Sequence, residues 1–161
     1  MDGQGPLVYY PYTNSTVDEP FAAGYAVQLF AHAIVPGASH GVNTTVMAET
    51  VRQALNALDI TRLPWCSDPP LYAMTAARLG MVDLAAEFLL QPNATPGGTM
   101  DYLSSGHCQI KGFLPVYTPG NGALLSAVAM LAGGWGGGPS AVGERWPSGF
   151  EVRAEGFAKM F

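Results

Sequence analysis

The sequence predicts an all-α fold in which helical hairpins form part of a toroid, followed by one short C-terminal strand. Two observations lead to this prediction. Five segments of the 161 residues have the length and apolar pattern of helices. These segments alternate between helices that are apolar on every side and helices that are amphipathic. The same alternation of inner and outer helices is typical of an α/α toroid.

The most apolar of these segments is Tyr117–Trp135, YTPGNGALLSAVAMLAGGW. A turn at Pro119–Gly122 precedes an apolar run from Ala123 to Ala132, and Gly133-Gly134 follows as a stop. The run has no charge, and Ser126 is its only polar side chain, so the predicted helix has no polar face. It is too short to span a bilayer. We therefore expect a helix buried on all sides, with other helices packed around it.

The sequence of the N-terminal third predicts an irregular segment followed by two helices. Residues 1–20 are rich in Pro, Gly, Tyr and Asn, and Leu7–Tyr10 is either a short strand or an extended arm. Residues 20–34 predict a buried helix that begins near a proline. Thr44 or Thr45 then caps an amphipathic outer helix that ends near Leu58. Its apolar face consists of Met47, Val51, Ala54, Leu55 and Leu58, and its polar face of Glu49, Arg52 and Gln53.

The middle of the chain predicts two short helices and a long loop. An aromatic and polar connection, 59–70, leads into a helix at Leu71–Gly80, and a second helix follows at Met81–Gln91. Two helices joined at a single glycine form an αα-hairpin. The loop Pro92–Pro115 is long for a compact domain, and such loops are usually functional or insertions.

The C-terminal tail predicts one strand, and the chain as a whole predicts one partial domain. Residues 136–161 are rich in glycine and close on FEVRAEGF, whose alternation indicates a strand at Phe150–Ala154. A length of 161 residues suffices for one domain with a core. We therefore assign residues 1–161 to a single partial domain.

The composition limits the partners of this domain. Charged residues make up 12 %, about half the usual share of a soluble domain. Either the chain is the interior part of something larger, or sugar or a partner covers its surface. A net charge of −5 without a Lys/Arg patch argues against nucleic acid. No basic amphipathic stretch suggests a membrane surface.

Glycosylation motifs and cysteines favour a secretory route. Three sequons begin at Asn14, Asn43 and Asn93, and each is an N-glycan acceptor if a eukaryote secretes the protein. Residues 1–30 contain no signal peptide, so we expect a secreted protein whose signal lies upstream, or else a cytoplasmic one. Cys66 and Cys108 either form one disulfide or remain two free buried thiols.

Four segments together resemble a known family. They are WCSDPPLYAMTAARLG (Trp65–Gly80), DYLSSGH (Asp101–His107), LPVYTPGNGALLSAVAMLAGGW (Leu114–Trp135) and FEVRAEGF (Phe150–Phe157). In this order they resemble the C-terminal part of the six-hairpin glycosidases, the (α/α)6-toroid glycoside hydrolases that include the family 65 and family 95 types. The resemblance covers about residues 63–157 and implies roughly the last third of such a catalytic domain. The general acid of these families is usually a Glu before this region, and no residue here matches it.

Asp68 is the best candidate for a catalytic carboxylate. Glycoside hydrolysis uses two acidic groups flanking the sugar, or one acid and a phosphate in the phosphorylases. Asp68 lies near Trp65, between Cys66 and two prolines, directly before a predicted helix. It could act as a base or bind sugar hydroxyls, or it could be the N-cap of that helix. Trp65 offers an aromatic face on which a sugar ring can stack.

Two further residues are candidates for substrate binding. His107 in the long loop could bind a sugar hydroxyl or be an ordinary loop histidine. Asn121 could offer its amide to a ligand or cap the apolar helix. We expect structural roles for four other residues: a loop histidine, two core or hinge aromatics and a salt-bridge partner, namely His40, Trp135, Trp146 and Glu155.

No cofactor is expected. The His and Cys residues lack zinc-site spacing, so no metal site is predicted. No nucleophile elbow, P-loop or dinucleotide fingerprint is present. The resemblance implies a glycoside hydrolase that acts on oligo- or polysaccharides. This C-terminal part would bind carbohydrate, be inactive alone and pack against the missing N-terminal part of the toroid. The alternative is a non-catalytic helical module that binds carbohydrate or a protein.

Overall fold

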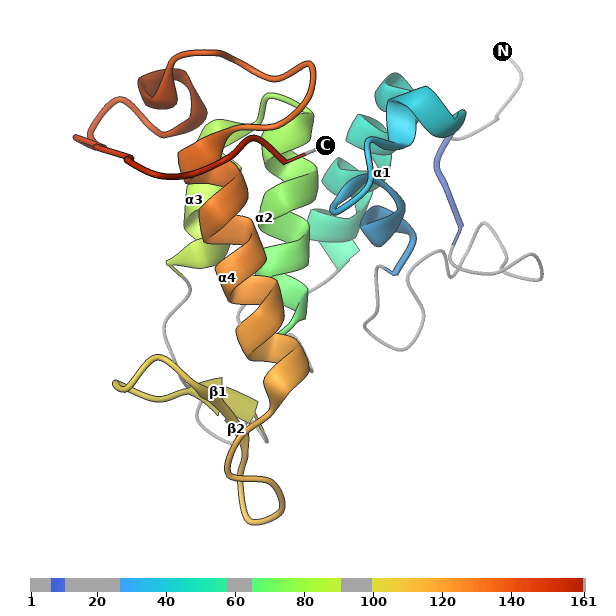
Figure 1. Cartoon of the computed structure of the whole chain (residues 1–161). Coiled ribbons are helices and arrows are strands. Elements are labelled where there is room, and N and C mark those ends of the chain that lie inside the picture. Colours follow the sequence, from blue (N-terminus) through green and yellow to red (C-terminus); the bar gives the residue numbers. More distant parts are fainter. Residues whose placement is uncertain (1–6, 11–26, 58–64, 91–99, 161) are drawn as a thin grey trace.

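The computed structural model describes residues 7–10, 27–57, 65–90 and 100–160 (Figure 1). Helices dominate this part of the chain, so the prediction of a mostly α fold is confirmed. The four α-helices are α1 (Thr44–Ala57), α2 (Asp68–Arg78), α3 (Val82–Leu89) and α4 (Thr118–Gly133). The short 3-10 helices are η2 (Val27–His32), η3 (Gly37–His40) and η5 (Val142–Arg145). The two strands are β1 (Met100–Tyr102) and β2 (Cys108–Ile110).

Helix α2 is the centre of the molecule. It packs against η2, α3 and α4, while α1 packs against η2. The Thr75 hydroxyl donates to the Leu29 carbonyl at 2.7 Å, and Arg78 Nε donates to the Ala33 carbonyl at 2.8 Å. Because Thr75 meets η2 and the later residue Arg78 meets the residue that follows η2, the two elements run parallel. Helix α4 also begins beside the beginning of α2 and runs in the same direction (Figure 1).

The predicted αα-hairpin is confirmed. Helix α2 ends at a turn in which Gly80 has φ 76°, a conformation that L side chains rarely adopt. The Met81 N–H returns to the Ala76 carbonyl at 2.9 Å, and α3 then runs back along α2. Tyr72 and Phe88 meet edge to face with ring centroids 5.4 Å apart. Helix α3 therefore packs antiparallel along α2, and the Tyr72 ring also contacts Phe30 of η2 with ring centroids 5.8 Å apart.

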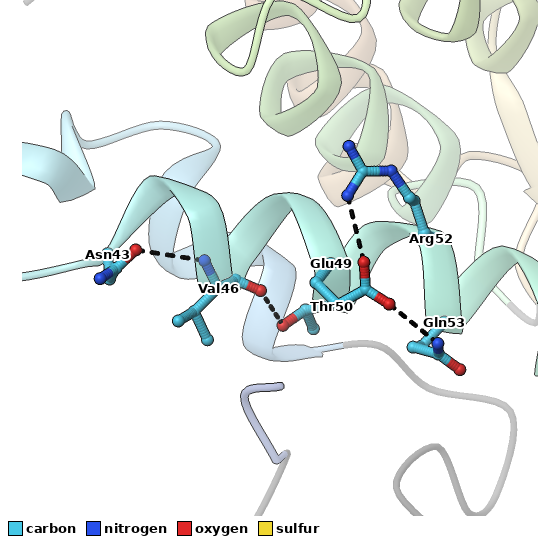
Figure 2. Close-up of polar contacts among 6 residues, drawn as sticks. All are labelled: Asn43, Val46, Glu49, Thr50, Arg52 and Gln53. Atoms are coloured by element: carbon cyan, nitrogen blue, oxygen red, sulfur yellow. Dashed lines mark hydrogen bonds and ion pairs between the residues drawn. The ribbon is translucent and has the colours of Figure 1, made fainter. Parts of the chain in front are cut away.

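The predicted amphipathic helix is confirmed as α1, but its cap is a different residue. Asn43 Oδ1 accepts a hydrogen bond from the Thr45 N–H at 3.0 Å and one from the Val46 N–H at 3.2 Å. Figure 2 shows the bond to Val46. Asn43 is thus the N-cap, and the prediction of Thr44 or Thr45 is wrong by one or two positions. The buried face of α1 consists of Met47, Val51 and Ala54. On the opposite face, Glu49 accepts hydrogen bonds from Arg52 and Gln53 (Figure 2).

The prediction that two helices are buried on all sides is wrong. On α4, Leu125 is 71 % and Val128 39 % exposed, although Ala127, Met130 and Leu131 on the other side are buried. The described part of the first predicted helix is the 3-10 helix η2, and Ala31 on it is exposed. A side chain is buried only where another element covers it, and apolar residues on every face do not indicate which face is covered.

The predicted strand at Phe150–Ala154 is also wrong. These residues are irregular, and the tail instead forms a single parallel bridge between Trp135 and Met160. The tail crosses the end of α4, where a Cβ on Gly133 would lie 2.5 Å from the Ala158 carbonyl. A strand needs a neighbouring strand for its hydrogen bonds, and a helix offers none.

A buried arginine holds the tail against α4. Arg145 is buried and donates from Nε to the Leu131 carbonyl at 2.9 Å and from Nη2 to the Ala132 carbonyl at 2.7 Å. These are two of the carbonyls that the end of a helix leaves without helical partners. The expected salt bridge of Glu155 is absent from the described residues: Glu155 is exposed, and Arg153 pairs with Glu151 at 2.7 Å.

The long loop contains a β-hairpin that the sequence analysis did not predict. Strands β1 and β2 pair antiparallel, with Tyr102 opposite Cys108. The turn between them is closed by the Leu103 N–H, which donates to the His107 carbonyl at 2.8 Å. Gly106 in this turn has φ 83°. The hairpin lies at the beginning of α4, below the helices in Figure 1.

Candidate functional site

The N-terminal ends of α2 and α4 meet at the β-hairpin, and the candidate site lies there. A disulfide between Cys66 and Cys108 joins the residues just before α2 to strand β2, with 6.2 Å between the Cα atoms. The alternative of two free thiols is therefore excluded. The disulfide also brings together Trp65 and Asp68, which flank Cys66, and Tyr117, which directly precedes α4.

Hydrogen bonds reinforce this junction. The Tyr102 hydroxyl lies 2.8 Å from both the Cys66 and the Gly120 carbonyl oxygens. The Cys108 N–H donates to Asn121 Oδ1 at 2.8 Å, and the Tyr117 N–H donates to the Cys108 carbonyl at 2.7 Å. Burial raises the pKa of Tyr102 above its usual range, so the phenol stays neutral and keeps its proton for donation. Tyr102 thus links the hairpin to both helices.

Helix α4 approaches the disulfide closely through a glycine. A Cβ on Gly120 would lie 2.7 Å from the Cβ of Cys66 and 3.2 Å from that of Cys108. Only a residue without a side chain fits there without displacing the disulfide or the helix. The two glycines of the PGNG turn therefore differ, because a Cβ on Gly122 would meet no atom within 4 Å.

Asp68 is a buried carboxylic acid. It is the first residue of α2 and is 3 % exposed, and its Oδ2 accepts a hydrogen bond from the Trp65 N–H at 3.3 Å. Burial raises its pKa to about 7, although the Trp65 hydrogen bond opposes that shift. The N-cap position belongs to Ser67, so the interpretation of Asp68 as the cap is wrong. Near neutral pH Asp68 exists in both protonation states and can donate or accept a proton.

Trp65 and Tyr117 form an aromatic pair beside Asp68. Their ring centroids are 6.0 Å apart and their planes differ by 28°, so the rings are stacked. Trp65 is 38 % exposed and Tyr117 is half-buried, so part of the indole faces solvent. An exposed aromatic face beside a polar group suits a sugar ring, which has apolar C–H faces and hydroxyl edges. Trp65 thus contributes its backbone N–H to Asp68 and its ring to the surface.

The other two predicted site residues have different positions. Asn121 neither caps α4 nor presents its carbonyl to solvent, because Oδ1 accepts the Cys108 N–H. It is part of the support of the site. His107 lies in the hairpin turn, where Nδ1 is 2.9 Å from the Ser105 hydroxyl. Within the described segments no hydrogen bond or ion pair joins His107 to Asp68 or Trp65.

The structural roles expected for three other residues agree with their positions. His40 Nδ1 contacts the Ser39 hydroxyl and the Pro36 carbonyl of its own turn. Trp135 is buried in the core, and Trp146 donates from Nε1 to the Leu131 carbonyl at 3.2 Å.

The sequons at Asn14 and Asn93 lie outside the described residues, whereas Asn43 is described and exposed.

The described residues contain no group of three His, Cys, Asp or Glu side chains that could hold a metal ion. None of their helices has the length and hydrophobicity needed to cross a bilayer.

This junction contains three of the residues predicted from the sequence, namely Trp65, Asp68 and Asn121. Two further residues of the site, Tyr117 and Tyr102, were not predicted from the sequence. The only available signal for Tyr102 was its place in the DYLSSGH motif. The chain matches no protein-family model, no curated protein and no solved structure, so no relative assigns a role to these residues.

Proposed function

We propose that this chain is the C-terminal part of a six-hairpin glycoside hydrolase and forms one wall of its carbohydrate pocket. The observation that carries the proposal is the partly exposed Trp65 ring, held beside the buried carboxyl of Asp68 at the beginning of α2. In this role Trp65 and Tyr117 stack on a sugar ring. Asp68 binds a hydroxyl or exchanges a proton with the substrate.

The arrangement of helices supports the proposal. In a toroid of helical hairpins, inner helices run parallel and each is followed by an outer helix that returns. Here η2, α2 and α4 run in one direction, and α3 returns along α2. In the proposed toroid, the inner helices are therefore η2, α2 and α4, and the outer helices that follow the first two of them are α1 and α3. The candidate site lies where two of the inner helices begin.

The exposed apolar side chains of α4 support the view that part of the toroid is missing. Leu125 and Val128 face outward on a helix that has no charged residue. In the complete enzyme, the missing hairpins cover this face. In this proposal the second catalytic group also comes from the missing part, as the resemblance implies. The isolated chain is therefore inactive.

The Cys66–Cys108 disulfide supports a secreted protein. Disulfides persist in oxidising compartments and are rare in the cytosol. The carbohydrate partner is then a glycan outside the cytoplasm.

Carbohydrate binding tests the proposal. Neutral oligosaccharides of different linkages are titrated into the full chain, and tryptophan fluorescence is recorded. We expect saturable binding, and affinity at least about tenfold weaker in Trp65→Ala because stacking is lost; titration calorimetry measures the variant, which lacks the reporting tryptophan. Phe150→Ala is the matched control, since Phe150 pairs with Trp146 away from the site with ring centroids 5.7 Å apart. No binding by the wild type, or equal loss in both variants, would contradict the proposal.

Hydrolysis tests the expectation that the isolated chain is inactive. A panel of aryl glycosides is incubated with the full chain, and no release of the aryl group is expected. Robust turnover that disappears in Asp68→Asn would show that the chain carries a complete active site.

The second candidate is a non-catalytic helical module that binds carbohydrate or a protein. The exposed side chains of Leu125 and Val128 favour a protein ligand for this module. Light scattering and a melting curve separate the candidates. A soluble, cooperative monomer favours the module, and aggregation or a molten state favours the incomplete toroid.

A further inference from the structure

The residue that caps α1 is also the first residue of a glycosylation sequon. Asn43, Thr44 and Thr45 form the acceptor sequence Asn-Xaa-Thr, and all three residues are exposed. Sequons are common by chance, so the structural setting of this one decides whether it can carry a glycan. Three features decide this: the atoms of the Asn43 amide, the backbone around Asn43 and the cellular compartment in which the chain folds.

The two atoms of the Asn43 side-chain amide have separate roles. Oδ1 accepts the N–H groups of Thr45 and Val46, and the oxygen is turned toward the helix (Figure 2). Nδ2 makes no hydrogen bond with any described residue. Nδ2 is the atom to which an N-linked glycan is attached. Capping therefore uses Oδ1 and leaves Nδ2, the atom to which the glycan would be attached, available.

The backbone at Asn43 is held from the other side by Tyr9. The Asn43 N–H donates to the Tyr9 hydroxyl at 2.8 Å, and the Tyr9 N–H donates to the Thr50 hydroxyl at 2.9 Å. The Thr50 hydroxyl in turn donates to the Val46 carbonyl at 2.7 Å (Figure 2). Asn43 is thus fixed at the surface in one orientation, with its amide nitrogen outside this network.

We propose that Asn43 carries an N-linked glycan in the native protein and still caps α1. The donor is a polyprenyl-pyrophosphate-linked oligosaccharide. Nδ2 forms a bond to C1 of the first sugar and loses one proton to the solvent. The C1–O bond to the pyrophosphate breaks, and its electron pair leaves with the lipid pyrophosphate. The product remains an amide, so Oδ1 keeps accepting the two backbone N–H groups. The Cys66–Cys108 disulfide independently indicates the oxidising compartments through which secreted proteins pass.

Site occupancy tests the proposal. The full chain is secreted from cultured animal cells behind a cleavable leader and digested with chymotrypsin, which separates Asn43 from the other two sequons. Glycosidase treatment in ¹⁸O water then marks each occupied asparagine for mass spectrometry. We expect Asn43 to be marked in most molecules. A secreted wild-type chain with unmarked Asn43 would overturn the proposal, whatever the state of Asn14 and Asn93.

Four variants at the sequon separate glycosylation from capping. Thr45→Ala keeps Asn43 but destroys the sequon, so the glycan should be lost. Thr45→Ser and Thr44→Ala preserve the sequon and should retain the glycan. The midpoint of thermal unfolding should be similar in wild type and Thr45→Ala. It should fall by about 2–4 °C in Asn43→Gln, which loses the cap. A wild-type midpoint as low as that of Asn43→Gln would show that the glycan displaces the cap.

Discussion

Asp68 places a carboxyl group where folding removes it from water. Its one partner among the described residues is the Trp65 N–H, and no cation lies against it. A carboxylate in such a place is more stable with its proton, which is why its pKa is about 7. The same burial that suits Asp68 to proton transfer also makes the folded chain sensitive to pH.

The stability of the chain should fall as Asp68 is ionised. The pKa is about 7 in the folded chain against 3.8 in the unfolded chain, so folding favours the neutral form. The contribution of Asp68 is therefore fully present below pH 3.8 and is lost as the pH rises through 7. The full loss is on the order of 4 kcal/mol. Urea unfolding of the wild type and Asp68→Asn from pH 4 to 8 measures this loss. We expect the free energy of unfolding of the variant to exceed that of the wild type by an amount that grows as the pH rises.

A neighbouring helix provides the control for this measurement. Asp83 lies exposed in the first turn of α3, so Asp83→Asn makes the same substitution at a carboxyl that folding does not bury. If the difference between wild type and Asp68→Asn stays constant over this pH range, Asp68 is not a neutral carboxyl in the folded chain.

At the scale of elements, α2 and α4 come together through a contact that admits no side chain. Gly120 lies in the first turn of α4 against the Cys66 and Cys108 side chains. Gly122 lies two residues later on the same helix and faces open space. The sequence PGNG does not distinguish these glycines, whereas the packing of the helices does.

Substitution of these two glycines by alanine should change the stability of the chain in opposite directions. Gly120→Ala forces a methyl group into the disulfide and should destabilise the chain by about 1–3 kcal/mol. Gly122→Ala adds a better helix former without a clash and should stabilise it by about 0.5–1 kcal/mol. Urea midpoints of the two variants measure the difference. Equal midpoints would mean that α4 does not approach the disulfide closely.

At the scale of the whole molecule, the disulfide joins the hairpin to the helices. It closes a loop across 42 positions of sequence, and Tyr102 and Asn121 add their hydrogen bonds beside it. Trp65 lies on one side of this junction and Tyr117 on the other, so their stacking depends on the junction being closed.

Reduction of the disulfide should loosen the aromatic pair and destabilise the chain. From the length of the closed loop, the expected loss is about 4 kcal/mol of unfolding free energy. Near-ultraviolet circular dichroism reports the Trp65–Tyr117 pair, and urea unfolding reports stability. The chain has two cysteines, so a thiol reductant breaks no other disulfide. Unchanged stability in a Cys66→Ser, Cys108→Ser variant would contradict this prediction.

The helices could be predicted from the sequence because local interactions determine them. The apolar period of α1, the single glycine between α2 and α3 and the glycines that follow α4 are all short-range signals. The same signals failed for Phe150–Ala154, where alternation suggested a strand but no partner strand lies beside it. They also could not indicate that Leu125 is exposed while Leu131 is buried.

The sequence by itself determined the helical class of the chain and the positions of α1 to α4. It also indicated Trp65 and Asp68 as candidate residues of the functional site. Tertiary structure alone decided that Cys66 pairs with Cys108, that Tyr102 bridges two helices and that Arg145 binds the end of α4. It also decided the raised pKa of Asp68. These features depend on residues that are far apart in the chain and adjacent only after packing. Pairing, close approach and burial are therefore properties of the folded molecule.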